Sequence, residues 1–188
     1  MTGVQTCALP IYKSIGFICQ DITALDLYGT VDVMICFMDT VNHITDIRKV
    51  RSFFRSCKRF LDPGGLLIFD IATEKHFAVT LGDKTFAEDS SDHTLIWSNS
   101  YNKAKALNKA DITVFSKLEN GLFCRNETEI RERYYPPETI ISIMTDNELE
   151  VKAIYSDLTD HPPGTASERI FFVVRNDNDP QKNSLLSS

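Results

Sequence analysis

The sequence predicts an α/β fold in which a mostly parallel sheet carries an antiparallel β insert. Two continuously apolar runs, Val31 to Phe37 and Leu66 to Ile71, enclose a helical pattern. Strand, helix and strand in this order are typical of parallel strands that are covered on both faces. Between His93 and Tyr135 the pattern changes to strand-like segments, two of which are joined through Asn120-Gly121, a strong hairpin signal.

The helix between the two apolar runs is amphipathic. Thr45 or Asp46 can cap its start, and Pro63-Gly64-Gly65 ends the pattern. Lysines and arginines fill its outer face, but no aromatic residues lie among them and the whole chain carries a net charge of −6. We therefore interpret this face as solvated and expect no nucleic-acid partner. The apolar residues recur at steps of three and four and form one stripe: Ile47, Val50, Phe53, Phe54, Cys57, Phe60 and Leu61.

Segments on either side of this unit predict further elements. Ser14 to Gln20 is a short apolar segment and predicts a strand, with Asp21 just past its carboxyl end, where open α/β sheets bind ligands. A carboxylate at such a place is more often a turn former or a helix cap. Ala72 to Asp92 is polar and mixed, so we expect a short helix or a loop there. The strands of the insert are predicted at His93 to Tyr101, Asp111 to Lys117 and Phe123 to Tyr135.

The last part of the chain predicts one helix and two strands. Pro137 and Glu138 suit the first turn of a helix, and Asn147 can act as its left-handed stop. Leu149 to Tyr155 alternates like a strand, and Ile170 to Val174 is apolar throughout, like a buried strand.

Composition limits the cellular setting and the kinds of site. No apolar run reaches the roughly 18 residues that a membrane span requires, so no membrane partner is expected. The five cysteines are odd in number and lack CxxC spacing. Cys19, Cys36 and Cys57 lie inside apolar patterns, so we expect them to be core residues in a reducing, cytoplasmic setting. No spacing joins these cysteines to the four histidines as metal ligands, so no metal site is predicted.

The order of these elements resembles the second half of a class I S-adenosylmethionine-dependent methyltransferase, which has a Rossmann-like fold. The insert is similar to the β-rich substrate cover of small bacterial members. The resemblance spans Ser14 to Arg175 and implies S-adenosylmethionine as the cofactor and a small molecule as the methyl acceptor. The segments that carry it are QDIT at 20–23, VDVMICFMDTVNHI at 31–44, LDPGGLLIFDI at 61–71, RERYYPPET at 131–139 and SERIFFVVR at 167–175.

The sequence departs from this family at its start. No GxGxG occurs among the 8 glycines, so the glycine-rich loop after the family's first strand is missing, as is the acidic end of its second strand. We therefore expect an N-terminal truncation, a sheet that is incomplete in its N-terminal half, and impaired cofactor binding and activity. Val31 to Phe37 would then form an apolar edge strand through which two chains can pair as a homodimer.

These patterns divide the chain into five regions. Residues 1–12 fit nothing that follows and resemble the translation of a sequencing adapter, so we expect a non-native leader. Residues 13–71 form the partial methyltransferase core, and 72–135 form the connecting segment and the β insert. Residues 136–175 add the last helix and strands of the core, and 176–188 form a polar tail that we expect to be disordered.

The resemblance also implies roles for individual residues. Asp21 would bond the adenine amino group, Ile22 would pack on the ring, and the turn Phe37, Met38 and Asp39 would line the cofactor. Methyl transfer depends on alignment rather than on a nucleophilic side chain, so no catalytic residue is assigned. His43 is either a general base or an ordinary histidine at a helix start, and the aromatic residues either line an acceptor pocket or pack between insert and sheet. The acceptor-side candidates are Asn42, His43, Trp97, Tyr134 and Tyr135.

Two other functions are compatible with the residues. One is a non-catalytic binding or dimerisation module that uses the exposed edge strand. The other is a different Rossmann-like enzyme, such as a nicotinamide dehydrogenase, whose fingerprint would lie in the missing half. The hairpin insert followed by helix, strand and IFFVV is less usual in that second class.

Overall fold

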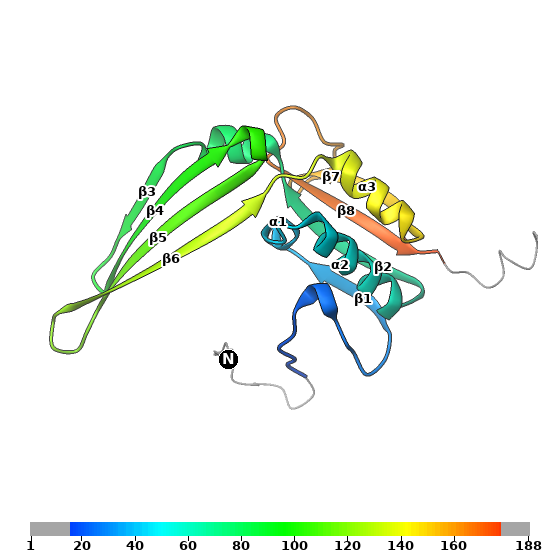
Figure 1. Cartoon of the computed structure of the whole chain (residues 1–188), viewed down its shortest axis with the longest axis horizontal. Helices are drawn as coiled ribbons and strands as arrows, with labels where there is room; N and C mark the ends of the chain where they lie inside the picture. The colour runs from blue at the N-terminus through cyan, green and yellow to red at the C-terminus, as the bar shows by residue number, and fades with distance from the viewer. Residues whose placement is uncertain (1–15, 178–188) are drawn as a thin grey trace, which may run out of the picture.

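The computed structural model describes residues 16–177, which form two four-stranded sheets joined near the middle of the molecule. Figure 1 shows a core sheet with helices on one face and a second, extended sheet that projects away from it. The structure is therefore of the α/β, Rossmann-like class with an antiparallel insert, as the sequence predicts. In the part of the chain that is described, no helix is both long and apolar enough to cross a membrane.

The core sheet has the strand order β1 (Val31–Cys36), β2 (Leu61–Ala72), β8 (Arg169–Asn176) and β7 (Leu149–Ser156). β1 and β2 are parallel, with Val33 opposite Leu66 and Cys36 opposite Phe69. β8 is antiparallel to both of its neighbours. Helix α2 (Ile47–Phe60) makes the crossover between β1 and β2, which confirms the predicted strand–helix–strand unit.

Helices α2 and α3 (Pro137–Asp146) lie on the same face of the core sheet (Figure 1). The predicted apolar stripe of α2 is buried there, since Phe53, Phe54 and Cys57 are all at most 3% exposed. Phe54 packs edge-on against Phe69, and Phe69 stacks on Phe172 at 4.9 Å between ring centroids. Asp46 caps α2 by accepting a hydrogen bond from the backbone N–H of Arg48. Of the two predicted cap residues, Thr45 and Asp46, the cap is therefore Asp46.

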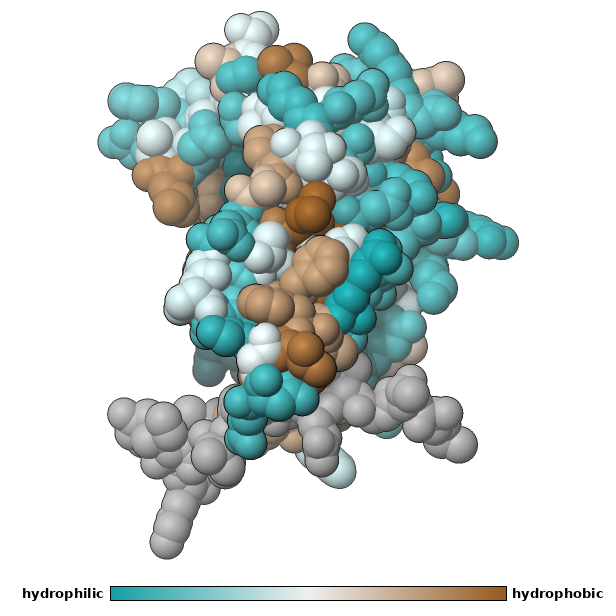
Figure 2. Space-filling view, turned by 90° about the vertical axis from the view of Figure 1, so that its left-hand side faces the viewer, coloured by the Kyte–Doolittle hydropathy of each residue, from teal (hydrophilic) through white to brown (hydrophobic). Residues whose placement is uncertain are grey.

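The insert is an antiparallel meander in the order β3 (Thr85–Asp89), β4 (His93–Asn102), β5 (Leu107–Lys117) and β6 (Phe123–Arg133). The hairpin between β5 and β6 turns at Gly121, whose φ of +82° suits glycine, and this confirms the hairpin signal. Figure 2 views the molecule from the side of the insert and shows a band of hydrophobic residues bordered by hydrophilic ones.

Within the described residues, four short helices lie between or before the strands, and one of them, η2, lies on the chain between the core strand β2 and the insert strand β3. They are η1 (Ile22–Ala24), α1 (Thr40–His43), the π-helix η2 (His76–Leu81) and η3 (Lys103–Lys105). α1 contacts both the core strand β2 and the insert strand β6, so it lies at the seam between the sheets (Figure 1).

Three expectations need correction. Residues 16–20 of the predicted strand Ser14 to Gln20 are not a strand, because no described strand lies beside them and the Gln20 amide bonds the backbone of Asp26 instead. Asn147 does not take the left-handed conformation, since its φ is −101°, and Glu148 takes it with a φ of 55°. β8 continues through Asn176, one residue into the predicted tail, because the buried Asn176 amide donates to the Leu61 carbonyl at 2.8 Å.

Two boundaries also differ. The mixed segment 72–92 contains the expected short helix, η2, but also β3, whose residues are all exposed and therefore lack the apolar alternation that marks a strand. β2 begins at Leu61 and includes Pro63-Gly64-Gly65, where its pairing with β1 is irregular. Cys19, expected in the core, is exposed, whereas Cys57 is buried. The predicted leader at 1–12 and residues 178–188 of the tail lie outside the described residues.

Candidate functional site

The parallel strands β1 and β2 end at the same edge of the core sheet, and the chain makes an unusual turn there. Met38 and Asp39, which follow β1, both have positive φ values of 62° and 49°. This region is unfavourable for residues other than glycine, so surrounding bonds must hold the turn in place. The Asp39 N–H donates to the Asp70 carboxylate at 3.1 Å, and the Thr40 hydroxyl donates to the Phe37 carbonyl at 2.7 Å.

An ion cluster fixes this turn to the end of β2. Asp70 is fully buried, and Arg169 of β8 donates to it and also lies 3.3 Å from the Asp39 carboxylate. Burial lowers the pKa of Arg169, but its hydrogen bond to Asp70 and the charge of Asp39 outweigh that effect, so its pKa is raised. Oδ1 of Asp70 is buried without a hydrogen-bond partner among the described residues. A buried acceptor without a partner is costly and is commonly met where a ligand binds.

A cavity of about 640 Å³ opens beside this cluster. One wall is apolar, because Phe37 packs edge-on against Phe171 at 5.7 Å and Met38 is 75% exposed. The opposite wall is polar and includes His76 and Glu168. A hydrogen bond from Thr80 lowers the pKa of Glu168, so this carboxylate is held in its charged form. A mainly apolar hollow with a few fixed polar groups is typical of small-molecule sites.

A second group of titratable side chains lies at the seam beside α1. One ligand-type atom from each of Asp39, His43 and Glu132 lies within 4.8 Å of the others. His43 Nε2 is 3.7 Å from Glu132 Oε1, and the Glu132 Oε2 accepts from the Asn108 amide at 3.4 Å. Burial raises the pKa of Glu132, while the nearby His43 lowers it. The predicted absence of a metal site stays a prediction.

Asp21 and Ile22 lie apart from that cavity. Asp21 caps η1, and its carboxylate accepts from the backbone and the hydroxyl of Thr23 at 2.9 and 2.7 Å. The side-chain bond from Thr23 is the main cause of its lowered pKa, and Lys49 at the start of α2 lies 3.9 Å away. Ile22 lines another hollow, of about 320 Å³, along the open face of β1. Phe37 and Met38 thus line the cavity, and the next residue, Asp39, stands with His43 in the titratable group. Ile22 lines the other hollow, and Asp21 lies beside it at the cap of η1.

Asn42 lies at the seam and holds the two sheets together. It is fully buried. Its amide donates to the Arg133 carbonyl at 2.8 Å, and its Oδ1 accepts from the Ala72 N–H at 2.9 Å. Tyr135 is also buried, and its hydroxyl donates to the Ile44 carbonyl. The side chains of these two acceptor-side candidates are therefore buried and hydrogen-bonded to the backbone.

The remaining aromatic candidates pack at the base of the insert. Trp97 and Tyr134 lie against the small buried cluster of Ala72, Phe77 and Leu81. Tyr134 also borders a hollow of about 660 Å³ with Glu74 and Lys103 along its rim. Both alternatives considered from the sequence, pocket lining and packing, therefore remain open for Tyr134.

Sequence reasoning missed three residues of this edge: Asp70, Glu132 and Arg169. Asp70 had a usable signal, because a single carboxylate inside the buried run LLIFDI is unusual unless it is paired. Glu132 stands in a segment of alternating charges, and Arg169 stands outside the predicted strand, so neither carried such a signal.

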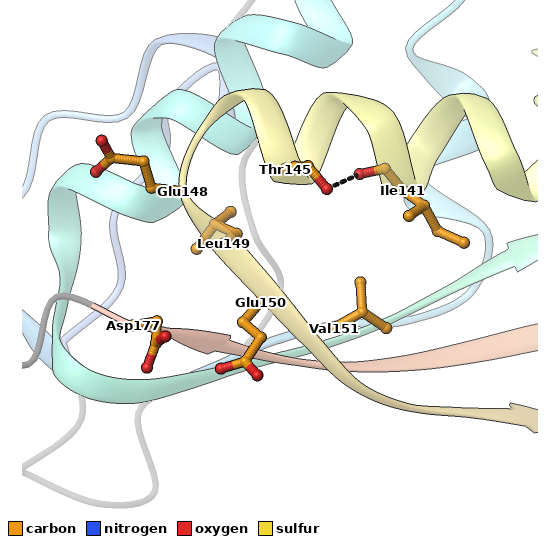
Figure 3. A pocket seen from close by; sticks show the side chains of 7 residues that line it. All are labelled: Ile141, Thr145, Glu148, Leu149, Glu150, Val151 and Asp177. Carbon is orange, nitrogen blue, oxygen red and sulfur yellow. Dashed lines mark hydrogen bonds between the residues drawn. The ribbon is translucent and has the colours of Figure 1, made fainter. Parts of the chain in front are cut away.

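Another hollow lies at the opposite end of the core sheet. Figure 3 shows it between α3 and the start of β7, where the side chain of Thr145 bonds the Ile141 carbonyl. Its volume is about 500 Å³, and the residues around it include Glu148, Glu150 and Asp177. β7 begins beside Arg175 of β8, and Arg175 in turn pairs with Leu66 of β2, on the side of β2 away from its carboxyl end. This hollow is therefore far from the edge at which β1 and β2 end.

Comparisons with known proteins point to one family. The profile of a family described as "Methyltransferase domain" matches residues 4–69. A protein of Geobacillus sp. (strain WCH70) with a methyltransferase name is 26% identical over 162 residues, which cover 86% of this chain and 66% of that protein. The YqeM protein of Bacillus subtilis (strain 168), which also has a methyltransferase name, is 27% identical over 157 residues, 83% of this chain and 62% of its own length.

A solved structure agrees with these relatives. The S-adenosylmethionine-dependent methyltransferase of Clostridium acetobutylicum ATCC 824 superposes with a TM-score of 0.77 at 25% identity, covering 84% of this chain and 63% of that one. The CcbJ methyltransferase of Streptomyces caelestis shares the fold, with a TM-score of 0.70 at 17% identity, covering 84% and 62%. This chain spans less than two thirds of the length of each of these proteins.

Proposed function

We infer that this chain belongs to the class I S-adenosylmethionine-dependent methyltransferase family, and from that premise we propose that the whole protein transfers a methyl group to a small molecule in the cytoplasm. The observation that carries the proposal is the turn of Phe37, Met38 and Asp39. It stands at the shared carboxyl edge of β1 and β2, where sheets of this kind bind ligands. The cavity beside it supports a small-molecule acceptor.

The residues at this edge suit such a cofactor. Met38 and Phe37 offer an exposed apolar surface, and the carboxylates of Asp39 and Asp70 offer acceptors for hydroxyl and amino groups. We propose that Phe37, Met38 and Asp39 line the cofactor, and that Asp21 and Ile22 contact its adenine. Asp21 already accepts two bonds from Thr23, so its second oxygen would bond the adenine amino group.

When bound, S-adenosylmethionine would supply an electrophilic methyl group, carried on a sulfonium, to the lone pair of the acceptor. The residues of this chain would hold the reactants in line and exclude water from the site. The paired Phe37 and Phe171 keep water from one side of the cavity, and the Arg169 guanidinium fixes both carboxylates. Asn42, His43, Trp97, Tyr134 and Tyr135 are proposed on the acceptor side, with Asn42 and Tyr135 acting through the backbone they hold.

Calorimetric titration with S-adenosylmethionine tests the function. A full-length protein of the relatives' length should bind it, and Met38→Ala should weaken that binding. Leu122→Ala is the matched control, because Leu122 is 65% exposed in the turn between β5 and β6 and does not line this cavity. If the full-length protein shows no heat of binding, the proposed function fails.

We also propose that the 188-residue chain binds the cofactor more weakly than the full-length protein, by orders of magnitude. The supporting observation is that these residues contain no glycine-rich loop to grip the cofactor's tail. Equal affinities of the two proteins in the same titration would contradict this.

The second candidate function is a dimerisation module. β1 lies at the edge of the core sheet within the described residues, and its Val33 and Ile35 are 48% and 63% exposed. An apolar edge of this kind favours pairing between copies. Light scattering should then find a stable dimer that Ile35→Lys converts to a monomer. A dimer without cofactor affinity would favour this function over methyl transfer.

A further inference from the structure

The group formed by Asp39, His43 and Glu132 has a clear arrangement but no assigned role. Asp39 precedes α1 and His43 ends it, whereas Glu132 stands near the end of β6, so the core contributes two members and the insert contributes one. Their nearest atoms, His43 Nε2 and Glu132 Oε1, are 3.7 Å apart. This separation is within ion-pair range and slightly longer than a hydrogen bond, as is usual for catalytic pairs before the substrate is present.

Glu132 is held rigidly from the side of the insert. It is 6% exposed, and its Oε2 accepts from the Asn108 amide. The same amide donates to Oδ1 of Asn99 at 3.3 Å, and both asparagines are buried in the insert sheet. A carboxylate fixed in this way can orient an imidazole beside it, as in the histidine–carboxylate pairs of many enzymes.

His43 faces the opposite way. Its side chain is 44% exposed, and Nδ1 has no hydrogen bond to any residue in the described part of the chain. A proton on Nε2, the nitrogen that faces Glu132, leaves the lone pair of the neutral ring on Nδ1, which is then the atom that can receive a proton. The ring therefore has one nitrogen held by the insert and one free for a ligand.

The charges around this ring are mainly negative. The pKa of Glu132 is raised mainly by burial, and also by the negative charge of Asp39 in the turn. His43 of α1 and His76 of η2 both lower this pKa. Arg169 neutralises only part of this charge, because it shares its guanidinium between Asp39 and the buried Asp70. Carboxylates at this spacing attract a cation far more than a neutral alcohol.

We propose that the methyl acceptor is an amine that binds as its ammonium form, that His43 is its proton acceptor, and that Glu132 is the positioning residue for His43. This inference rests on the proposed function. In the step that it adds, an N–H bond of the ammonium breaks, the proton moves to Nδ1 of His43, and the electron pair stays on the amine nitrogen as its lone pair. The imidazolium that forms is stabilised by Glu132, and the free amine is then able to accept a methyl group.

The first test needs neither cofactor nor turnover. The chemical shift of the Glu132 carboxyl carbon is measured by NMR as a function of pH in the 188-residue chain. The Glu132→Gln variant, which lacks this signal, assigns it. His43→Gln should raise the pKa of Glu132 further, because it removes the imidazolium that lowers it. His161→Gln, in a loop where the side chain is 80% exposed, should leave that titration unchanged. If His43→Gln also leaves it unchanged, the pair is not coupled and the proposal fails.

The second test addresses the class of acceptor with a matched pair of probes, benzylamine and benzyl alcohol. The ring signals of His43 should respond to benzylammonium at concentrations about tenfold lower than to the alcohol, which corresponds to about 1.4 kcal/mol. Glu132→Gln should reduce this preference and Glu132→Asp should restore it, which a purely structural role would not predict. Equal response to both probes would overturn the amine assignment, while the cofactor titration tests the proposed function separately.

Discussion

Replacing Asn42 by alanine should weaken the connection between the two sheets more than it changes any ligand contact. The buried Asn42 side chain serves two backbone groups at once, the Ala72 N–H of β2 and the Arg133 carbonyl of β6. The Ala72 N–H is buried, so its loss of a partner should cost about 1–3 kcal/mol. The Arg133 carbonyl lies in a partly exposed residue and can be rehydrated, so its loss should cost about 1 kcal/mol.

The sum predicts that Asn42→Ala lowers the free energy of unfolding by about 2–4 kcal/mol. Urea unfolding followed by circular dichroism measures this value. Trp97 is the only tryptophan and stands on β4, so its fluorescence reports the insert separately. In Asn42→Ala the fluorescence transition should move to lower urea than the circular dichroism transition, because the insert loses its tie to the core.

Asn126→Ala is the control for this measurement. Asn126 stands on β6 and is exposed, and its amide makes a long contact of 3.7 Å with the Cys124 sulfur. Its replacement should change the free energy of unfolding by no more than about 0.5 kcal/mol. A loss below about 1 kcal/mol for Asn42→Ala, with coincident transitions, would refute the reasoning.

Two further predictions concern backbone space and buried charge. Gly65→Ala should destabilise the fold by about 1–3 kcal/mol, because a Cβ there would lie 2.9 Å from the Asp32 carbonyl oxygen, whereas Gly164→Ala meets nothing within 4 Å and should be neutral in the same urea assay. Burial raises the pKa of Glu132 above 4.5, so its contribution to stability is full below about pH 4.5 and is lost as pH rises through the folded-state pKa. The free energy of unfolding of Glu132→Gln should therefore rise relative to that of the unmodified chain between pH 4 and pH 8. The exposed Glu127→Gln is the control and should show no such trend. A difference in unfolding free energy that stays constant across this range would contradict the burial of charge.

The sequence predicted the core unit because its signals are local. The apolar runs around β1 and β2 and the stripe on α2 repeat with the period of the structure they form, and burial of residues such as Phe54 and Leu67 follows directly. The segment at 16–20 is as apolar as a short strand, but a strand also needs a partner, and none lies beside it among the described residues. β3 has a partner and no apolar signal, so it could not be found.

The candidate site was predicted only in part, for a similar reason. The position of Asp39 follows from the end of one strand, which a sequence reveals. The contacts of Asp39 with Arg169, and of His43 with Glu132, join residues that are far apart in the chain, and they depend on how β8 and β6 pair. Such contacts are set by sheet register, which no local pattern encodes.

Several of the bonds that fasten the insert to the core are directed at main-chain atoms. Besides the bonds of Asn42, the Arg133 guanidinium donates to the Thr45 carbonyl at 2.7 Å, and the Tyr135 hydroxyl donates to the Ile44 carbonyl. Main-chain partners are present whatever side chains stand at positions 44 and 45. A different set of insert strands between residues 85 and 131 would consequently meet the same main-chain partners in the core, as long as Asn42, Arg133 and Tyr135 are kept.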